Sequence, residues 1–183
     1  MLVTNDLTLY ERAKILRSHG MTSLSYERSK GHSTSYDVVE LGYNYRIDDI
    51  HSAIALAQLS KLPNDLAERA KIRQRYIERL SGIDKIELPF LHNQEYVSNY
   101  IFPIVLRDSN AEIRDDVRHQ LHAAGIQTSV HYPAAHRFSI YEQYGARLKW
   151  TEYVTDNEIT LPMYAKLTDE QIDYISDALG KIC

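Results

Sequence analysis

Residues 40–46, Glu-Leu-Gly-Tyr-Asn-Tyr-Arg, stand directly before the first long apolar pattern of the chain. They place a flexible glycine, two phenols, an amide and a guanidinium just ahead of a helix that we expect to begin at Asp48 or Asp49. Helix N-termini attract anions, and Asn and Arg side chains donate hydrogen bonds to phosphate oxygens. Two interpretations are open: Asn44 and Arg46 bind a phosphate, or the stretch is a capped turn whose tyrosines pack on the core.

The helix after this stretch is predicted from an apolar stripe of close-packing residues, Ile50, Ala53, Ile54 and Ala57. Pro63 interrupts the pattern and predicts either a kink or a break. A second helical pattern follows over residues 65–80, with charged side chains on its outer face, and Ser81-Gly82 ends it.

The sequence before residue 40 predicts one helix and one long loop. Leu2 and Val3 resemble the end of a strand, and a helix is expected over residues 7–18, with an N-cap among residues 4–6 and Gly20 as its stop. Residues 21–37 are polar and aperiodic, which predicts a loop or an irregular hairpin.

Strands alternate with helices after residue 82. We expect strands over residues 85–89, 100–106 and 126–130, and Pro103 assigns the second strand to a sheet edge or a bulge. The last two predicted helices have apolar stripes formed by Ile113, Val117 and Leu121, and by Ile172, Ile175, Leu179 and Ile182. This order of elements indicates a compact α+β unit.

Local signals also mark the ends of these two helices. Asn110 is the expected N-cap of the first helix, and Gly125 is its expected stop. Thr168 and Gln171 form a predicted capping box at the start of the second.

A second polar cluster, Ser-Val-His-Tyr-Pro at residues 129–133, lies at the end of a predicted strand. The residue before a proline is held in an extended conformation, so the strand is expected to continue to Tyr132. Two interpretations are open here as well. Either His131 and Tyr132 face a ligand, or His131 hydrogen-bonds to a backbone carbonyl beneath a turn.

The composition excludes several classes of protein. The chain has 183 residues, of which 44% are hydrophobic and 25% charged, and its apolar runs fall short of the roughly 18 residues of a membrane span. A net charge of −4 lacks the basic surplus of a nucleic-acid-binding surface. The first residues show no secretory signal, so a cytoplasmic location is expected.

Metal and disulfide chemistry have little support in the sequence. Cys183 is the single cysteine, which excludes a disulfide within these residues and a zinc site built from cysteines. His119 and His122 are three residues apart on a predicted helix but lie off its apolar stripe, so we expect them to face solvent.

Several motifs, taken together and in order, resemble one known family. They are VTND at residues 3–6, LRSHGM at 16–21, ELGYNYR at 40–46 followed by AIALAQL at 53–59, TSVHYP at 128–133, and LPMY with LTDEQIDY from residue 161. This order resembles the pyridoxal-phosphate (PLP) dependent nucleotide-sugar aminotransferases of the DegT/StrS type. Residues 83–110 share only the general strand pattern.

The resemblance implies a fold-type I aminotransferase, an α/β family that works as a homodimer with active sites at the subunit interface. Residues 1–62 would be the end of the large cofactor domain, and residues 63–82 a linking helix. Residues 83–183 would be a small C-terminal α+β domain with a short sheet. The intact enzyme would transfer an amino group, from glutamate, to a keto sugar carried on a nucleotide.

The resemblance also implies roles for four residues. Asn44 matches the residue that reaches the PLP phosphate of the neighbouring subunit, and Arg46 would lie near that site. His131 and Tyr132 match a pair that faces the sugar nucleotide in related enzymes. Ile101 stands where many relatives have histidine on this strand.

The lysine that holds PLP as a Schiff base lies, in the family, shortly before the segment matching residues 2–6. None of the eight lysines here matches it: Lys14, Lys30, Lys61, Lys71, Lys85, Lys149, Lys166 and Lys181. We therefore expect the C-terminal part of such an enzyme, inactive alone. Its uncovered apolar faces are expected to cause either self-association or local disorder before about residue 60. The alternative is a non-catalytic dimerisation, regulatory or sugar-nucleotide-binding module derived from the family.

Overall fold

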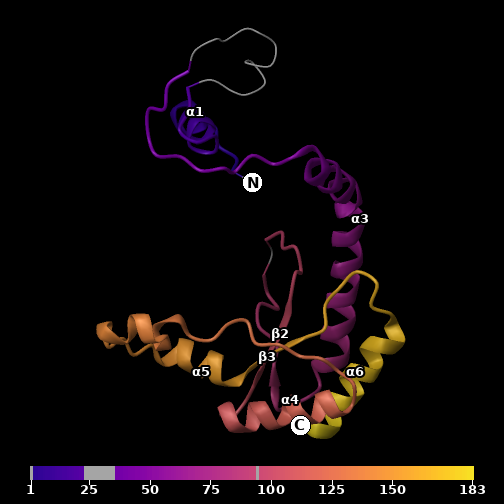
Figure 1. Cartoon of the computed structure of the whole chain (residues 1–183). Helices are drawn as coiled ribbons and strands as arrows, with labels where there is room; N and C mark the ends of the chain where they lie inside the picture. The colour runs from indigo at the N-terminus through magenta and orange to yellow at the C-terminus, as the bar shows by residue number, and fades with distance from the viewer. Residues whose placement is uncertain (1, 23–35, 94) are drawn as a thin grey trace. The chain divides into compact units, whose positions relative to one another are not determined.

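The computed structural model describes residues 2–22, 36–93 and 95–183 (Figure 1). The chain divides into two compact units, Met1–Ser60 and Lys61–Cys183. The predicted loop over residues 21–37 falls largely outside the described residues. None of the helices in the described ranges has the length and apolar character needed to cross a membrane.

The first unit contains helix α1, Leu7–Leu16, which begins as the sequence predicts. Asp6 is its N-cap, and one carboxylate oxygen accepts hydrogen bonds from the backbone N–H groups of Thr8 (2.8 Å) and Leu9 (3.1 Å). The helix ends before Gly20, because Arg17 is already its C-cap. Leu2 and Val3 form no strand in the described residues, where no neighbouring segment pairs with them.

Helix α3, Asp49–Leu80, begins and ends where the sequence predicts, but Pro63 does not break it. Pro63 has no N–H to donate to the carbonyl four residues earlier, so one bond of the helix is missing there. The turns on either side remain helical. Near its C-terminal end, α3 buries Ile72, Tyr76 and Leu80 in the core of the second unit.

The second unit contains a three-stranded antiparallel sheet with the order β1-β2-β3. The strands are β1 (Ile86–Glu87), β2 (Phe102–Leu106) and β3 (Glu158–Leu161). β2 is therefore the central strand and not an edge strand, which corrects the prediction for the strand as a whole, although the side of Pro103 that faces away from β3 is unpaired among the described residues.

The register explains how the central strand accommodates Pro103. β1 pairs only with Val105 and Leu106, so Pro103 has a single neighbour, Thr160 of β3. Thr160 directs its backbone N–H and C=O to Ser129, on the side away from β2 (2.8 and 3.1 Å). The Pro103–Thr160 pair is thus a non-hydrogen-bonded pair, and the proline removes no bond between these strands.

Some elements of the second unit were not predicted. Residues 126–130 form no strand and contribute only the isolated bridge from Ser129 to Thr160. Helix α5 (Lys149–Asn157) and strand β3 are absent from the sequence prediction, as are the short 3₁₀ helices η1 (Ala135–Arg137) and η2 (Ser139–Tyr144). The fold is nevertheless the expected mixture of helices and a small sheet.

Helices α4 (Ala111–Ala123) and α6 (Asp169–Ile182) confirm the capping predictions. Asn110 caps α4, Gly125 follows it at φ +76°, and Thr168 and Gln171 form the capping box of α6. In Figure 1, α4 lies below the sheet, and α6 descends to the right of the sheet and contacts α4. His119 and His122 are exposed, as expected.

The core of the second unit joins both helices to the sheet and to α3. Tyr76 is fully buried, its ring stacks on Phe102 at 4.7 Å, and its hydroxyl donates to the carbonyl of Pro162 (2.9 Å). The buried members of this core are Ile72, Tyr76, Leu80, Ile86, Phe102, Ile104, Leu106, Val117, Leu121, Ile126, Ile159, Leu161, Leu167, Ile172, Ile175 and Leu179.

Replacing Leu121 by alanine tests this core. Leu121 is fully buried, so Leu121→Ala should lower the free energy of unfolding by about 2–5 kcal/mol. Ile113, on the same helix, is 49% exposed although the sequence assigned it to the apolar stripe. Ile113→Ala should therefore change stability by no more than about 0.5 kcal/mol. Equal effects of the two variants in urea denaturation would contradict this description of α4.

An ion pair between α3 and α6 makes the stability depend on pH. Arg75 donates hydrogen bonds to Asp173 from both Nε and Nη2, and the shortest, from Nη2 to Oδ2, is 2.7 Å. The hydrogen bonds from Arg75 hold the pKa of Asp173 below its usual range. A carboxylate of this kind stabilises the fold above its unfolded pKa, and the contribution is lost as the pH falls through the folded pKa.

Asp173→Asn should therefore be less stable than the wild type at neutral pH. The difference should shrink as the pH falls below the ordinary aspartate pKa of about 3.9. Asp116→Asn is the matched control on α4, because its neighbour Gln120 can still donate to the amide oxygen. Urea midpoints measured across the acid range provide the comparison, and a pH-independent difference would contradict the assignment.

Candidate functional site

Two segments predicted from separate motifs lie side by side in the first unit. Residues 16–20 run next to residues 40–46, and Ser18 pairs with Asn44 in an isolated bridge. Backbone hydrogen bonds join them: Tyr43 N–H donates to Leu16 (2.6 Å), and His19 N–H donates to Tyr43 (2.9 Å). The LRSHGM and ELGYNYR motifs therefore form one structural feature.

Two glycines permit this close approach. A Cβ on Gly42 would lie 2.0 Å from the backbone nitrogen of Gly20, and a Cβ on Gly20 would lie 1.8 Å from the carbonyl oxygen of Glu40. Gly20 also has φ +73°, a conformation that favours glycine. Gly42 is thus needed because the two segments leave no room for a side chain there. The sequence had instead suggested that it provides flexibility.

The side chains of Asn44 and Arg46 are exposed. Arg46 Nη2 lies 3.4 Å from His19 Nε2, so an imidazole adjoins the guanidinium. Tyr43 and Tyr45 stack on each other at 5.0 Å and are exposed, so they do not pack on a core formed by the described residues. An amide and a guanidinium in one loop can bind the oxygens of a phosphate.

The N-terminus of α3 is not an open anion site. This corrects the expectation that the start of the helix itself helps to bind a phosphate. Asp48 accepts hydrogen bonds from the backbone N–H of His51 (2.8 Å) and pairs with its imidazole (2.6 Å). These hydrogen bonds hold the pKa of Asp48 below its usual range, so a carboxylate occupies the cap position. A phosphate bound here would depend on the loop side chains.

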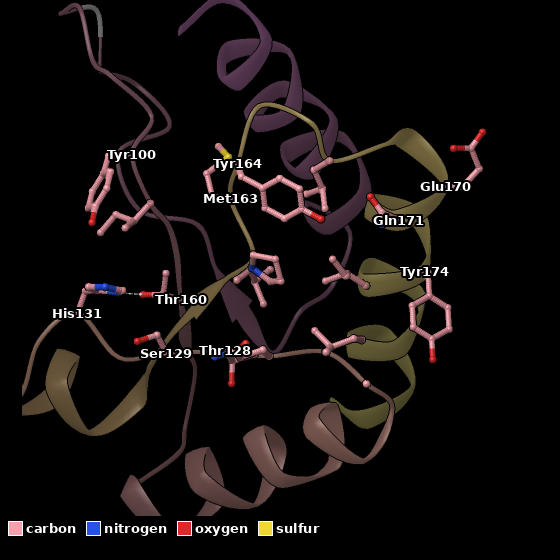
Figure 2. Close-up of a pocket in the computed structure, with 18 residues that line it drawn as sticks. Tyr100, Thr128, Ser129, His131, Thr160, Met163, Tyr164, Glu170, Gln171 and Tyr174 are labelled. Carbon is pink, nitrogen blue, oxygen red and sulfur yellow. Dashed lines mark hydrogen bonds between the residues drawn. The ribbon is translucent and has the colours of Figure 1, made fainter. Parts of the chain in front are cut away.

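A pocket of about 740 Å³ in the second unit includes His131 in its wall (Figure 2). Phenols surround it, contributed by Tyr100, Tyr164 and Tyr174. Ile101, where the family resemblance suggested histidine, gives the wall an apolar side chain. The pocket therefore offers a ligand aromatic surface, neutral polar groups and one carboxylate, that of Glu170.

Hydrogen bonds to β3 hold His131 in place. Its backbone N–H donates to Glu158 Oε2 (2.9 Å), and its Nδ1 lies 2.9 Å from the Thr160 hydroxyl, as the dashed line in Figure 2 marks. The Thr160 hydroxyl in turn donates to Glu158 Oε1. The imidazole thus contacts a side chain, and the alternative of a backbone carbonyl partner is wrong.

Tyr132 lies differently from its neighbour. Its ring contacts the His131 ring edge-on at 4.8 Å, but the side chain is 69% exposed and lies outside the pocket wall. The predicted pairs Asn44 with Arg46 and His131 with Tyr132 belong to different units. Each pair is assembled within its own unit.

Sequence reasoning missed Glu158 and Thr160. Both are buried in β3 and two residues apart, so they lie on the same face of the strand. The alternation of Glu158, Ile159, Thr160 and Leu161 is a strand signal that could have revealed them.

Comparisons with known proteins assign the family. A sequence profile described as the DegT/DnrJ/EryC1/StrS aminotransferase family matches residues 1–180. The chain belongs to the DegT/DnrJ/EryC1/StrS aminotransferase family. The resemblance noted in the sequence motifs is thereby confirmed.

A similar curated protein, from Helicobacter pylori, is named UDP-4-amino-4,6-dideoxy-N-acetyl-beta-L-altrosamine transaminase. It is 30% identical over 184 residues, covering 98% of this chain and 47% of the relative. A second relative, from Methanocaldococcus jannaschii, is 28% identical and has 49% of its length covered. The chain thus spans about half the length of these relatives.

Solved structures of aminotransferases resemble this chain over almost its whole length. Helicobacter pylori PseC, an aminotransferase involved in the biosynthesis of pseudoaminic acid, matches with a TM-score of 0.88 and 28% identity, covering 98% of this chain and 47% of PseC. A Streptococcus pneumoniae protein assigned as a sugar aminotransferase, in its PMP form, matches with a TM-score of 0.85 and 29% identity, covering 98% and 46%.

Gly42→Ala tests the close packing of the loop. The added Cβ meets backbone atoms of Gly20 and His19, so residues 38–46 should separate from residues 16–20. Hydrogen exchange should then become faster at the amides of Tyr43 and Tyr45. Gly82→Ala is the control, because a Cβ there has nothing within 4 Å. Unchanged exchange in Gly42→Ala would contradict the packing.

Proposed function

We propose that this chain is the C-terminal part of a PLP-dependent aminotransferase that transfers an amino group, from glutamate, to a nucleotide-linked keto sugar. The observation that carries the proposal is the family match over residues 1–180, joined to a loop with phosphate donors and a pocket with neutral polar groups. The H. pylori relative is named as a transaminase of a UDP-linked amino sugar, which supports the substrate class.

The proposal assigns each part of the chain to a role. Residues 1–62 complete the large cofactor domain, residues 63–82 form the linking helix, and residues 83–183 form the small domain. Exposed apolar residues on the first unit, among them Leu41, Ile50 and Ile54, support an interface with a second subunit. The working enzyme in this proposal is a homodimer.

The residues of the first unit fit the phosphate end of PLP. Asn44 supplies an amide and Arg46 a guanidinium, and both side chains are exposed on one loop. A Streptococcus pneumoniae homologue solved in PLP and PMP forms supports this cofactor. When bound, PLP supplies the electron sink for amino transfer, while Asn44 and Arg46 bind and orient its phosphate.

The pocket of the second unit is proposed to hold the sugar. His131 lines it and can accept or donate a hydrogen bond, and the surrounding phenols suit a sugar ring. Tyr132 would close the site from its exposed position beside His131. Binding there would place the sugar against aromatic and neutral polar side chains, with Glu170 as the one charged member among the described residues that line the pocket.

Asn44→Ala tests the phosphate contact in the intact protein. A hydrogen bond to a charged group contributes about 1.5–3 kcal/mol, so PLP affinity should fall at least roughly tenfold. Asn64→Ala, an exposed amide on α3, is the matched control and should retain the affinity. Equal PLP affinity of the two variants, measured by equilibrium dialysis, would remove Asn44 from the cofactor site.

A second experiment tests the proposal that these residues do not catalyse alone. None of the eight lysines matches the position that holds PLP in the family, so the 183-residue chain with PLP and glutamate should release no 2-oxoglutarate. The intact protein should release it, and should aminate a UDP-linked 4-keto sugar. Release by the 183-residue chain, or none by the intact protein, would contradict the proposal.

A further inference from the structure

We propose that Glu158 and Thr160 are positioning residues that hold His131 as the Nδ1–H tautomer, so that Nε2 accepts a hydrogen bond from the ligand. This inference rests on the proposed function for its ligand, a sugar. Thr160 and His131 both line the pocket in the second unit, where Figure 2 shows the hydrogen bond between them, and Glu158 lies two residues before Thr160 on β3.

The chain of hydrogen bonds starts at a buried carboxylate. Glu158 is 3% exposed, and both of its oxygens are used: Oε2 accepts from the His131 backbone N–H, and Oε1 accepts from the Thr160 hydroxyl. A buried carboxylate is tolerated only when hydrogen-bonded or paired. Among the described residues no cationic side chain pairs with Glu158, so these donors compensate its charge.

The direction of the hydrogen bond between Thr160 and His131 follows from the single hydrogen of the Thr160 hydroxyl. A hydroxyl has one hydrogen to donate, and an ionised carboxylate only accepts, so the Thr160 hydrogen goes to Glu158. The Thr160 oxygen then accepts from its other neighbour, His131 Nδ1, at 2.9 Å. The proton therefore lies on Nδ1, and Nε2 of the neutral ring is an acceptor.

The acceptor at Nε2 selects the part of the ligand that binds here. It pairs with a hydroxyl or an amide N–H and disfavours a phosphate oxygen, which is also an acceptor. Among the side chains that line the pocket, Glu170 carries the sole full charge, and it is negative. The nearby guanidinium of Arg69 donates to the carbonyls of Tyr100 (3.4 Å) and Met163 (3.1 Å).

The pocket is thus suited to the neutral, hydroxyl-bearing ring of the substrate and unsuited to its diphosphate. Arg118 is not part of the pocket lining. Its guanidinium donates to the hydroxyl and carbonyl of Thr128, a residue of the pocket wall (3.3 and 3.5 Å). These cations stabilise the wall of the pocket and leave its interior without a positive side chain.

Long-range ¹H–¹⁵N NMR of the imidazoles tests the tautomer directly in the ligand-free 183-residue chain. The spectra are recorded about two pH units above the ordinary histidine pKa of about 6.5, where the ring is neutral. His131 should show the Nδ1–H pattern, whereas exposed His119 and His122 should show the Nε2–H pattern that predominates in water. An Nε2–H pattern for His131 would overturn the inference.

Glu158→Gln should reverse the chain of bonds. The amide oxygen still accepts from the His131 backbone, while the amide nitrogen donates to Thr160, which must then donate to Nδ1. The variant should therefore shift His131 to the Nε2–H pattern. Retention of Nδ1–H in a folded Glu158→Gln chain would overturn the inference.

Variants of Thr160 distinguish a role of its hydroxyl in setting the His131 tautomer from a role of its side chain in packing. Thr160→Val keeps the shape but should lose the Nδ1–H preference, and Thr160→Ser should retain it. Thr128→Val is the matched control on the same pocket wall and should leave the tautomer unchanged. If Thr160→Val behaves like the wild type, or Thr128→Val like Thr160→Val, the relay does not set the tautomer.

A ligand experiment distinguishes this inference from the proposed function. UDP-N-acetylglucosamine should shift the His131 signals, and inorganic pyrophosphate at the same concentration should not. A pyrophosphate shift equal to that of the sugar nucleotide would overturn the ligand preference argued here. No shift with either probe would overturn the sugar site of the proposed function, while the tautomer results in the ligand-free chain would be unaffected.

Discussion

The pairing of Thr160 with Ser129 is the contact on which the site in the second unit depends. Two backbone hydrogen bonds, of 2.8 and 3.1 Å, fasten the segment after α4 to the free edge of β3. This brings His131 over the face of the strand that carries Glu158 and Thr160. Side chains alternate along a strand, so a slip of one residue would replace that polar face with Ile159 and Leu161. The pairing register of Ser129 with Thr160 therefore also determines which side chains face His131.

The charged side chains of this unit mostly stabilise structure. Arg114 donates to the carbonyl of Thr155, and Arg137 binds both oxygens of Asp156, whose pKa these bonds hold below its usual range. The groups suited to phosphate, Asn44 and Arg46, belong instead to the first unit. In the proposed function, the residues that anchor the cofactor phosphate and those that face the sugar thus belong to different units of the chain.

The sequence predicted several helix ends correctly, because a helix end is determined by residues that are neighbours in the chain. The caps at Asp6, Asn110 and Thr168, and the end of α3 before Ser81, were recoverable because capping depends on residues within one turn. The polar motifs around Asn44 and His131 were recognisable because their donors are close in sequence. Their chemistry was visible before any fold was known.

Contacts between distant residues were not predictable in this way. Glu158 lies 27 residues from His131, so an alternating pattern at residues 158–161 can indicate the strand but not the contact between the two residues. The need for glycine at position 42 follows from its contact with Gly20, on a different segment. In both cases the residue type is explained by a partner that the sequence places far away.

Pro103 also affects how the unpaired edge of β2 can interact with other molecules. β1 covers only the last two residues of β2, so the earlier part of that strand has an uncovered edge. An unpaired row of backbone donors and acceptors can recruit a strand from another molecule. At Pro103 the outward position has no N–H to offer, so a foreign strand cannot extend the ladder there. The residue thereby protects the sheet against edge-to-edge aggregation.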